Sequence, residues 1–103
     1  MLLARWTIDA RFGYKQNVID SMKQWLQDIG AQVGLSSDKV RLLTGSVGAL
    51  EATVVSETLV TDLSELNAIW DKLATIDAHQ QWSKNLEPYV VSGTSRWEIF
   101  RVI

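Results

Sequence analysis

The chain contains no cysteine, one proline and one histidine among its 103 residues. The absence of cysteine excludes disulfide bonds, thiol nucleophiles and thiolate metal sites. With one histidine, a zinc site would need an unusual set of carboxylates, so we expect no metal site. No stretch approaches the ~18 apolar residues of a membrane span, and Arg5 follows too soon for a signal peptide. We therefore expect a cytoplasmic protein.

A strong charge of one sign is also lacking. Ten basic and twelve acidic residues give a net charge of -2. This balance offers no basic surface for nucleic acid or for an anionic membrane, so neither is an expected partner. With 47% hydrophobic residues, the chain can bury one modest core, and we expect a single domain over residues 1–103. Burial against a partner chain would supplement so small a core.

The first third of the chain shows two different periods. Apolar and polar residues alternate over residues 3–12, which predicts a strand whose apolar face extends to Phe12. Over residues 14–33, apolar residues recur at steps of three and four, which predicts an amphipathic helix. Gly30 or Gly34 can supply its left-handed C-terminal cap.

The middle of the chain predicts a hairpin followed by a helix. Residues 40–47 and 51–60 are rich in Val, Leu and Thr and predict two antiparallel strands. Asp62, followed three residues later by Glu65, matches a capping box, so a second helix is expected to start near Leu63.

The last third predicts a bent helix and a closing strand. The apolar stripe of the second helix does not continue through Trp82, which indicates a break near residues 77–78. The helix should end before Pro88, and residues 95–103 should form a fourth strand. The order strand, helix, strand, strand, helix, strand predicts an α+β fold of the ferredoxin-like type, with βαββαβ order. A four-stranded antiparallel sheet then carries the helices on one face.

The strands predict a sheet that is apolar on both faces. Two helices cover one face only, yet the second, third and fourth strands carry apolar residues on both sides. We expect a second copy of the chain to cover the open face in a twofold homodimer, with Val55 and Ile99 in the contact. The alternative is a monomer with an apolar open sheet.

The element order, the length and two segments near the end resemble a known superfamily. The segments are His79-Gln80-Gln81-Trp82 and Arg96-Trp97-Glu98-Ile99-Phe100. Together these features resemble the dimeric α+β barrel superfamily, and within it the NIPSNAP-like and antibiotic-biosynthesis-monooxygenase-like small domains. The resemblance covers nearly the whole chain and implies two ferredoxin-like subunits that close their sheets into a barrel. Such proteins include cofactor-independent monooxygenases, haem-degrading enzymes, and small-molecule isomerases and cyclases.

His79 is the first candidate for a catalytic residue. Its ordinary pKa lies near neutrality, and it falls where the second helix changes direction. The resemblance implies a general base, a hydrogen-bond donor or a haem ligand. The structural alternative is a partly exposed histidine at a helix end, and no orienting partner is visible in the sequence. We expect no cofactor, with haem as the less favoured alternative. The haem-degrading proteins use an asparagine on the first strand, where this chain offers Thr7 and Asp9.

Aromatic residues supply the candidate pocket walls. Trp6, Trp82 and Trp97 are expected to bind a small apolar ligand. By contrast, Trp25 and Trp70 lie on helix stripes at core spacing, which favours packing.

Three further side chains are candidate ligand-binding residues. Arg5 and Asp9 share the polar side of the first strand, where Arg5 could pair with Glu98 across strands. Tyr14, at the turn into the first helix, is expected either at the pocket mouth or in the core.

The sequence therefore favours a homodimer that binds a small apolar or aromatic molecule. If it is an enzyme, we expect cofactor-independent, monooxygenase-like chemistry at His79. The alternative is a non-enzymatic ligand-binding or assembly module, and haem binding is a third hypothesis. A cavity at His79 favours the first hypothesis over a filled core.

Overall fold

A computed structural model describes all residues of the chain, from Met1 to Ile103. The strands are β1 (Leu2–Asp9), β2 (Val40–Thr44), β3 (Thr53–Val60) and β4 (Arg96–Arg101). They form one antiparallel sheet in the order β2-β3-β1-β4. The α-helices are α1 (Lys15–Asp28), α2 (Leu63–Leu73) and α3 (Asp77–Leu86), and the short 3-10 helices are η1 (Gly30–Val33) and η2 (Glu87–Tyr89). The predicted ferredoxin-like fold is confirmed.

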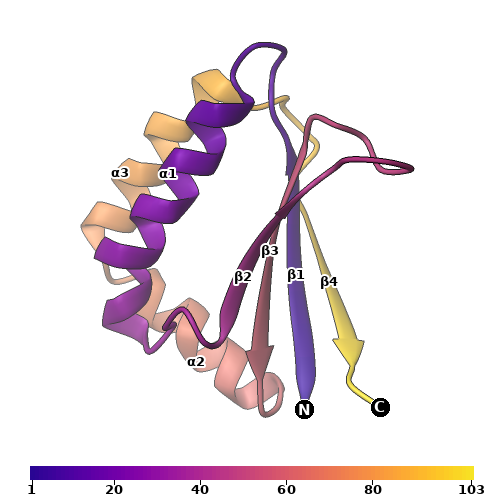
Figure 1. The fold of residues 1–103 in the computed structure, drawn as a ribbon. Coiled ribbons are helices and arrows are strands. Elements are labelled where there is room, and N and C mark those ends of the chain that lie inside the picture. Colours follow the sequence, from indigo (N-terminus) through magenta and orange to yellow (C-terminus); the bar gives the residue numbers. More distant parts are fainter.

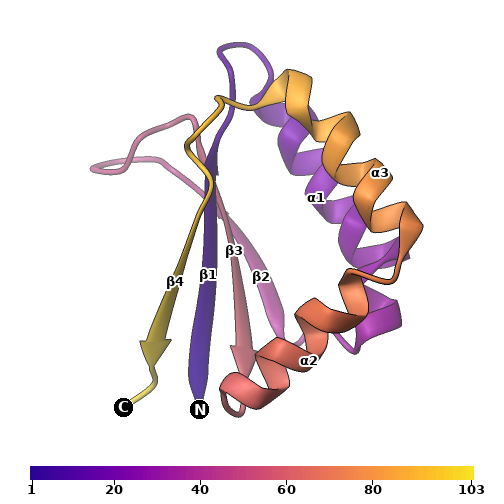
Figure 2. The same cartoon turned by 180° about the vertical axis from the view of Figure 1, so that it is seen from behind.

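The helices lie on one side of the sheet, and the loop between β2 and β3 projects from the other side (Figure 1). Helices α1 and α3 run side by side, while α2 lies at the end of the sheet that carries both chain termini (Figure 2). One face of the sheet is therefore covered and the other is open. No helix combines the length and the apolar character that a membrane span requires.

Local signals set the helix boundaries. The Asp62 side chain caps α2 by accepting a hydrogen bond of 2.9 Å from the backbone N–H of Glu65, as the capping box predicts. The predicted break is also confirmed, because α2 ends at Leu73 and α3 begins at Asp77. Gly34, with φ of 79°, provides the left-handed residue that ends η1.

Two predictions about the strands are wrong. β1 ends at Asp9, and Phe12 is fully exposed, because the chain leaves the sheet after Ala10 and turns toward α1. Ile99 lies opposite Ala4, which is fully buried, so Ile99 belongs to the helix-facing side of the sheet. Its neighbour Phe100 lies on the open face instead, since adjacent residues of a strand point to opposite faces.

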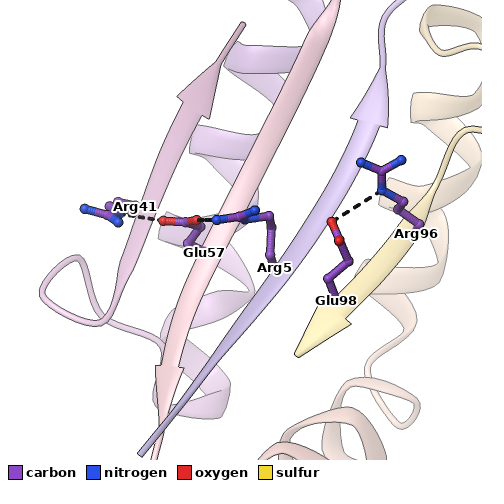
Figure 3. A network of polar contacts seen from close by, with 5 residues as sticks. All are labelled: Arg5, Arg41, Glu57, Arg96 and Glu98. Atoms are coloured by element: carbon purple, nitrogen blue, oxygen red, sulfur yellow. Dashed lines mark hydrogen bonds and ion pairs between the residues drawn. The ribbon is translucent and has the colours of Figure 1, made fainter. Parts of the chain in front are cut away.

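A buried carboxylate organises the open face. The side chain of Glu57 in β3 is only 2% exposed and lies between Arg5 of β1 and Arg41 of β2 (Figure 3). Its carboxylate oxygens lie 2.8 Å from a guanidinium nitrogen of Arg5 and 2.7 Å from one of Arg41. Burial alone would raise the pKa of Glu57, but hydrogen bonds from Arg41 and Arg5 outweigh this effect and hold the pKa below its ordinary value of 4.5. The Arg5 guanidinium also lies 4.7 Å from the ring centre of Phe100.

The sequence placed Arg5 with the wrong partner. The register does set Arg5 opposite Glu98, but the guanidinium pairs with Glu57. Glu98 pairs with Arg96 of its own strand at 3.4 Å (Figure 3). Arg5 pairs with Glu57 rather than Glu98 because the buried Glu57 carboxylate on the internal strand β3 accepts hydrogen bonds from both Arg5 and Arg41.

Glu57→Gln should destabilise the fold in a pH-dependent way. Its lowered pKa means that Glu57 stabilises the folded state above about pH 4.5 and loses this effect as the pH falls through the folded-state value. We expect a loss of about 1–3 kcal/mol near neutral pH, measured by urea unfolding, and a smaller difference from wild type in acid. Glu98→Gln is the control, with an expected change within about 0.5 kcal/mol. A pH-independent loss in Glu57→Gln would contradict this account.

Candidate functional site

A cavity of about 310 Å³ lies between the helix-facing side of the sheet and the helices. Of its 16 lining residues, 12 are hydrophobic and none is Asp, Glu, Lys or Arg. They are Trp6, Met22, Trp25, Leu26, Leu35, Leu42, Ser56, Thr58, Leu66, Ile69, Trp70, Leu73, His79, Trp82, Ser83 and Trp97. The volume and the apolar lining are those of a small-molecule site.

The cavity exists because β3 presents small side chains to the helix layer. Ser56 and Thr58 occupy successive helix-facing positions of this internal strand, where larger apolar residues would fill the space. Thr58 pairs with Ala4, which adds little volume of its own. The neighbouring walls are large and flat, so they surround the space without filling it.

All five tryptophans line this cavity. The expectation of Trp6, Trp82 and Trp97 as wall residues agrees with their positions. Trp25 and Trp70 pack against buried core residues, as their spacing predicts, and they line the cavity as well. The spacing of Trp25 and Trp70 correctly indicates that they face the sheet. Helical periodicity cannot tell whether the space on that side is filled.

Hydrogen bonds and ring contacts fix the walls in place. Trp6 donates its indole N–H to Ser95 Oγ at 2.8 Å, and Trp82 donates to the backbone oxygen of Ser21 in α1 at 3.0 Å. The rings of Trp70 and Trp97 meet edge to face with centres 5.3 Å apart. These contacts join β1, β4, α1, α2 and α3 around one cavity.

His79 has a partner that the sequence did not reveal. The indole N–H of Trp25 donates a hydrogen bond of 2.9 Å to His79 Nδ1, across 54 residues of sequence. The imidazole also stacks on Trp82, with ring centres 6.1 Å apart and an angle of 15° between the planes. Burial lowers the pKa of His79 below its ordinary value of 6.5, so the imidazole is neutral near pH 7.

Apart from His79 and the tryptophans, the polar side chains at the cavity are hydroxyls. Ser56 and Thr58 of β3 and Ser83 of α3 line it, and none of their side chains forms a hydrogen bond within the chain. Because no buried side-chain nitrogen or oxygen lacks a partner, these hydroxyls are open to the cavity or to solvent. Sequence reasoning overlooked them, since an alternating strand pattern does not distinguish a polar cavity position from a polar surface one.

Three of the expected ligand-binding residues lie away from this cavity. Arg5 is on the open face of the sheet, as described above. Asp9 lies at the end of β1, where its carboxylate accepts a hydrogen bond of 2.7 Å from Thr53 Oγ1. Tyr14 packs its ring on Tyr89 with centres 5.4 Å apart, beside the start of α1. The structure thus brings together His79 and the tryptophans, without Arg5, Asp9 or Tyr14.

Comparison with solved structures finds the same fold. A NIPSNAP family protein from Agrobacterium tumefaciens superposes with a TM-score of 0.80 and 16% sequence identity, over 99% of this chain and 92% of that chain. An antibiotic biosynthesis monooxygenase superposes with a TM-score of 0.68 and 8% sequence identity, over 100% of this chain and 99% of that chain. A dimeric protein of unknown function with a ferredoxin-like fold, from Bacteroides fragilis, superposes with a TM-score of 0.65 and 13% sequence identity. The match covers 98% of this chain and 96% of that chain.

These similarities define a class by fold. The chain has the ferredoxin-like α+β fold of NIPSNAP domain proteins, and it shares that fold with the monooxygenase, so the resemblance stated from the sequence is confirmed at the level of the fold. No protein-family model matches the chain, and no curated protein sequence matches it. Identities this low carry no assignment of chemistry, which has to be argued from the site.

His79 should make the stability of the protein fall below neutral pH. Because its folded-state pKa is lowered, the unfolded chain takes up the proton first as the pH falls through 6.5, and the free energy of unfolding decreases. In His79→Gln, this decrease should disappear, while stability at alkaline pH stays within about 1 kcal/mol of wild type. The measurement is urea unfolding at several pH values from mildly acidic to mildly alkaline. Equal pH dependence in the two proteins would contradict the assignment.

Proposed function

We propose that this protein binds a small, uncharged aromatic molecule in the cavity between sheet and helices. The observation that carries the proposal is a cavity of about 310 Å³ walled by all five tryptophans and lacking any charged side chain. Flat indole rings favour a flat ligand, through stacking and edge-to-face contacts. An ionised ligand would lose its hydration there without gaining an opposite charge.

The enzymatic form of this proposal is a cofactor-independent, monooxygenase-like reaction with His79 in contact with the substrate. It is supported by the cavity at His79 and by the fold shared with a protein named as an antibiotic biosynthesis monooxygenase. The alternative is a ligand-binding module without catalysis, for which the same walls suffice. Oxygen consumption in the presence of a bound aromatic compound separates the two.

Filling the cavity should abolish binding. Wild type should bind the uncharged fluorophore 1-aminoanthracene, with a rise in its fluorescence as it leaves water. Ser56→Leu should weaken binding at least tenfold, because its side chain would occupy the space in front of β3. The matched control is Ser64→Leu, on the exposed surface of α2. The proposal fails if wild type does not bind the probe, or if Ser56→Leu binds it as well as wild type.

A second copy of the chain is the proposed occupant of the open sheet face. The face exposes apolar side chains, with Leu43, Leu59 and Phe100 each about 40% exposed. Its charges also balance, because three arginines (Arg5, Arg41, Arg96) accompany three acids (Asp9, Glu57, Glu98). A face that exposes apolar side chains and carries no net charge is compatible with a twofold contact between identical faces. A neighbour with the same fold is described as dimeric.

Val55→Lys should dissociate this dimer. Val55 lies opposite Thr7 and Leu43 on the open face, so a lysine there would put two charges into a twofold contact. Sedimentation equilibrium should show a dimer for wild type and a monomer for Val55→Lys. Leu63→Lys, at an exposed position of α2, is the control and should remain dimeric. A monomeric wild type or a dimeric Val55→Lys would overturn the arrangement.

A further inference from the structure

The hydrogen bond between Trp25 and His79 fixes where the imidazole carries its proton. An indole N–H can only donate, so His79 Nδ1, at 2.9 Å from Trp25 Nε1, must be the unprotonated ring nitrogen. A neutral imidazole carries one proton, which therefore resides on Nε2. Nε2 forms no hydrogen bond within the chain, and His79 lines the cavity.

We propose that Trp25 is a positioning residue that holds His79 as the Nε2–H tautomer, so that His79 donates a hydrogen bond to a carbonyl oxygen of an uncharged aromatic ligand. The proposal rests on the proposed function of the cavity and narrows it to a ligand class, the aryl ketones, aldehydes and quinones. Trp25 does not contact the carbonyl of the ligand. It determines which nitrogen of His79 carries the proton that is donated to that carbonyl.

The same hydrogen bond disfavours the other roles expected for His79. A general base or a haem ligand would use the lone pair of Nε2, and the proton would then have to sit on Nδ1. There it would face the N–H of Trp25 at hydrogen-bond distance, donor against donor. The imidazolium ion has the same conflict. It is further disfavoured by the burial that lowers the pKa of His79 and by the position of His79 in the first turn of α3.

The surroundings of His79 favour a carbonyl over a carboxylate. No basic side chain lines the cavity, so a carboxylate or phenolate would face only neutral donors. Ser56, Thr58 and Ser83 add hydroxyls that can donate to a second oxygen. A neutral oxygen acceptor on an aromatic body fits both the donors and the indole walls.

The first arm of the test reads the tautomer directly. Because the chain has one histidine, protein labelled with ¹⁵N-histidine gives one unambiguous pair of ring-nitrogen signals. We expect the Nε2–H tautomer in wild type near neutral pH. Trp25→Phe, which keeps an aromatic ring without the N–H, should give a mixture of tautomers and a His79 pKa closer to its ordinary value.

Trp6→Phe is the matched control for the first arm. It loses a different indole hydrogen bond, to Ser95, and keeps the contact between Trp25 and His79. Its His79 signals should show the wild-type tautomer. An Nδ1–H tautomer in wild type, or identical tautomer populations in wild type and Trp25→Phe, would overturn the proposal.

The second arm measures binding of three probes of similar shape by quenching of tryptophan fluorescence. They are 2-acetonaphthone, 2-isopropenylnaphthalene, which has a methylene group in place of the carbonyl oxygen, and 2-naphthoate. We expect wild type to bind the ketone about tenfold more tightly than the hydrocarbon, as one hydrogen bond allows, and the carboxylate most weakly. In His79→Phe, the preference for the ketone should vanish while binding of the hydrocarbon persists.

The outcomes separate the two levels of the proposal. If no probe binds, the proposed function of the cavity fails. If ketone and hydrocarbon bind equally to wild type, the cavity binds aromatic molecules but the donor role of His79 is wrong. Tightest binding of 2-naphthoate would overturn the ligand class.

Discussion

A shortage of side-chain volume on one face of an internal strand is the constraint on which the rest of this structure depends. Ser56 and Thr58 present small polar side chains toward the helices at two successive positions of β3. Close packing would normally require the helices to move in and fill that space. The ring contact between Trp70 and Trp97 instead separates α2 from β4. Hydrogen bonds fix Trp6 at the edge of the sheet layer and Trp82 within the helix layer. The cavity is thus built into the sequence of β3.

The alternation of β3 also gives the sheet two different faces. Glu57, between those two small residues, points to the open face and is neutralised there by Arg5 and Arg41. Its burial between two strands ties the register of β1 and β2 to β3, because a slip of one residue would move the carboxylate into the apolar cavity. The ion pairs on one face therefore protect the composition of the cavity on the other.

Much of the fold could be predicted from sequence because local signals determine it. The change of period after Gly13, the cap at Asp62 and the break before Asp77 each depend on neighbouring residues. The errors have a different origin. The face of Ile99 and the partner of Arg5 depend on pairing between strands, and the Trp25–His79 contact joins residues 54 positions apart. Periodicity shows which residues share a face, but not which face of the sheet this is or what the side chains meet there.

The contact between Trp25 and His79 shows why a shared fold does not by itself transfer chemistry. A histidine at this bend can be a base, a donor or a ligand, and its own helix does not decide between these roles. The decision comes from α1, where a single indole N–H occupies one ring nitrogen and leaves the proton on the other. A residue without an N–H at the position of Trp25 would remove this constraint on the proton of His79. In this chain, the position of the histidine proton is therefore set by a pair of residues on two different helices, which the fold alone does not specify.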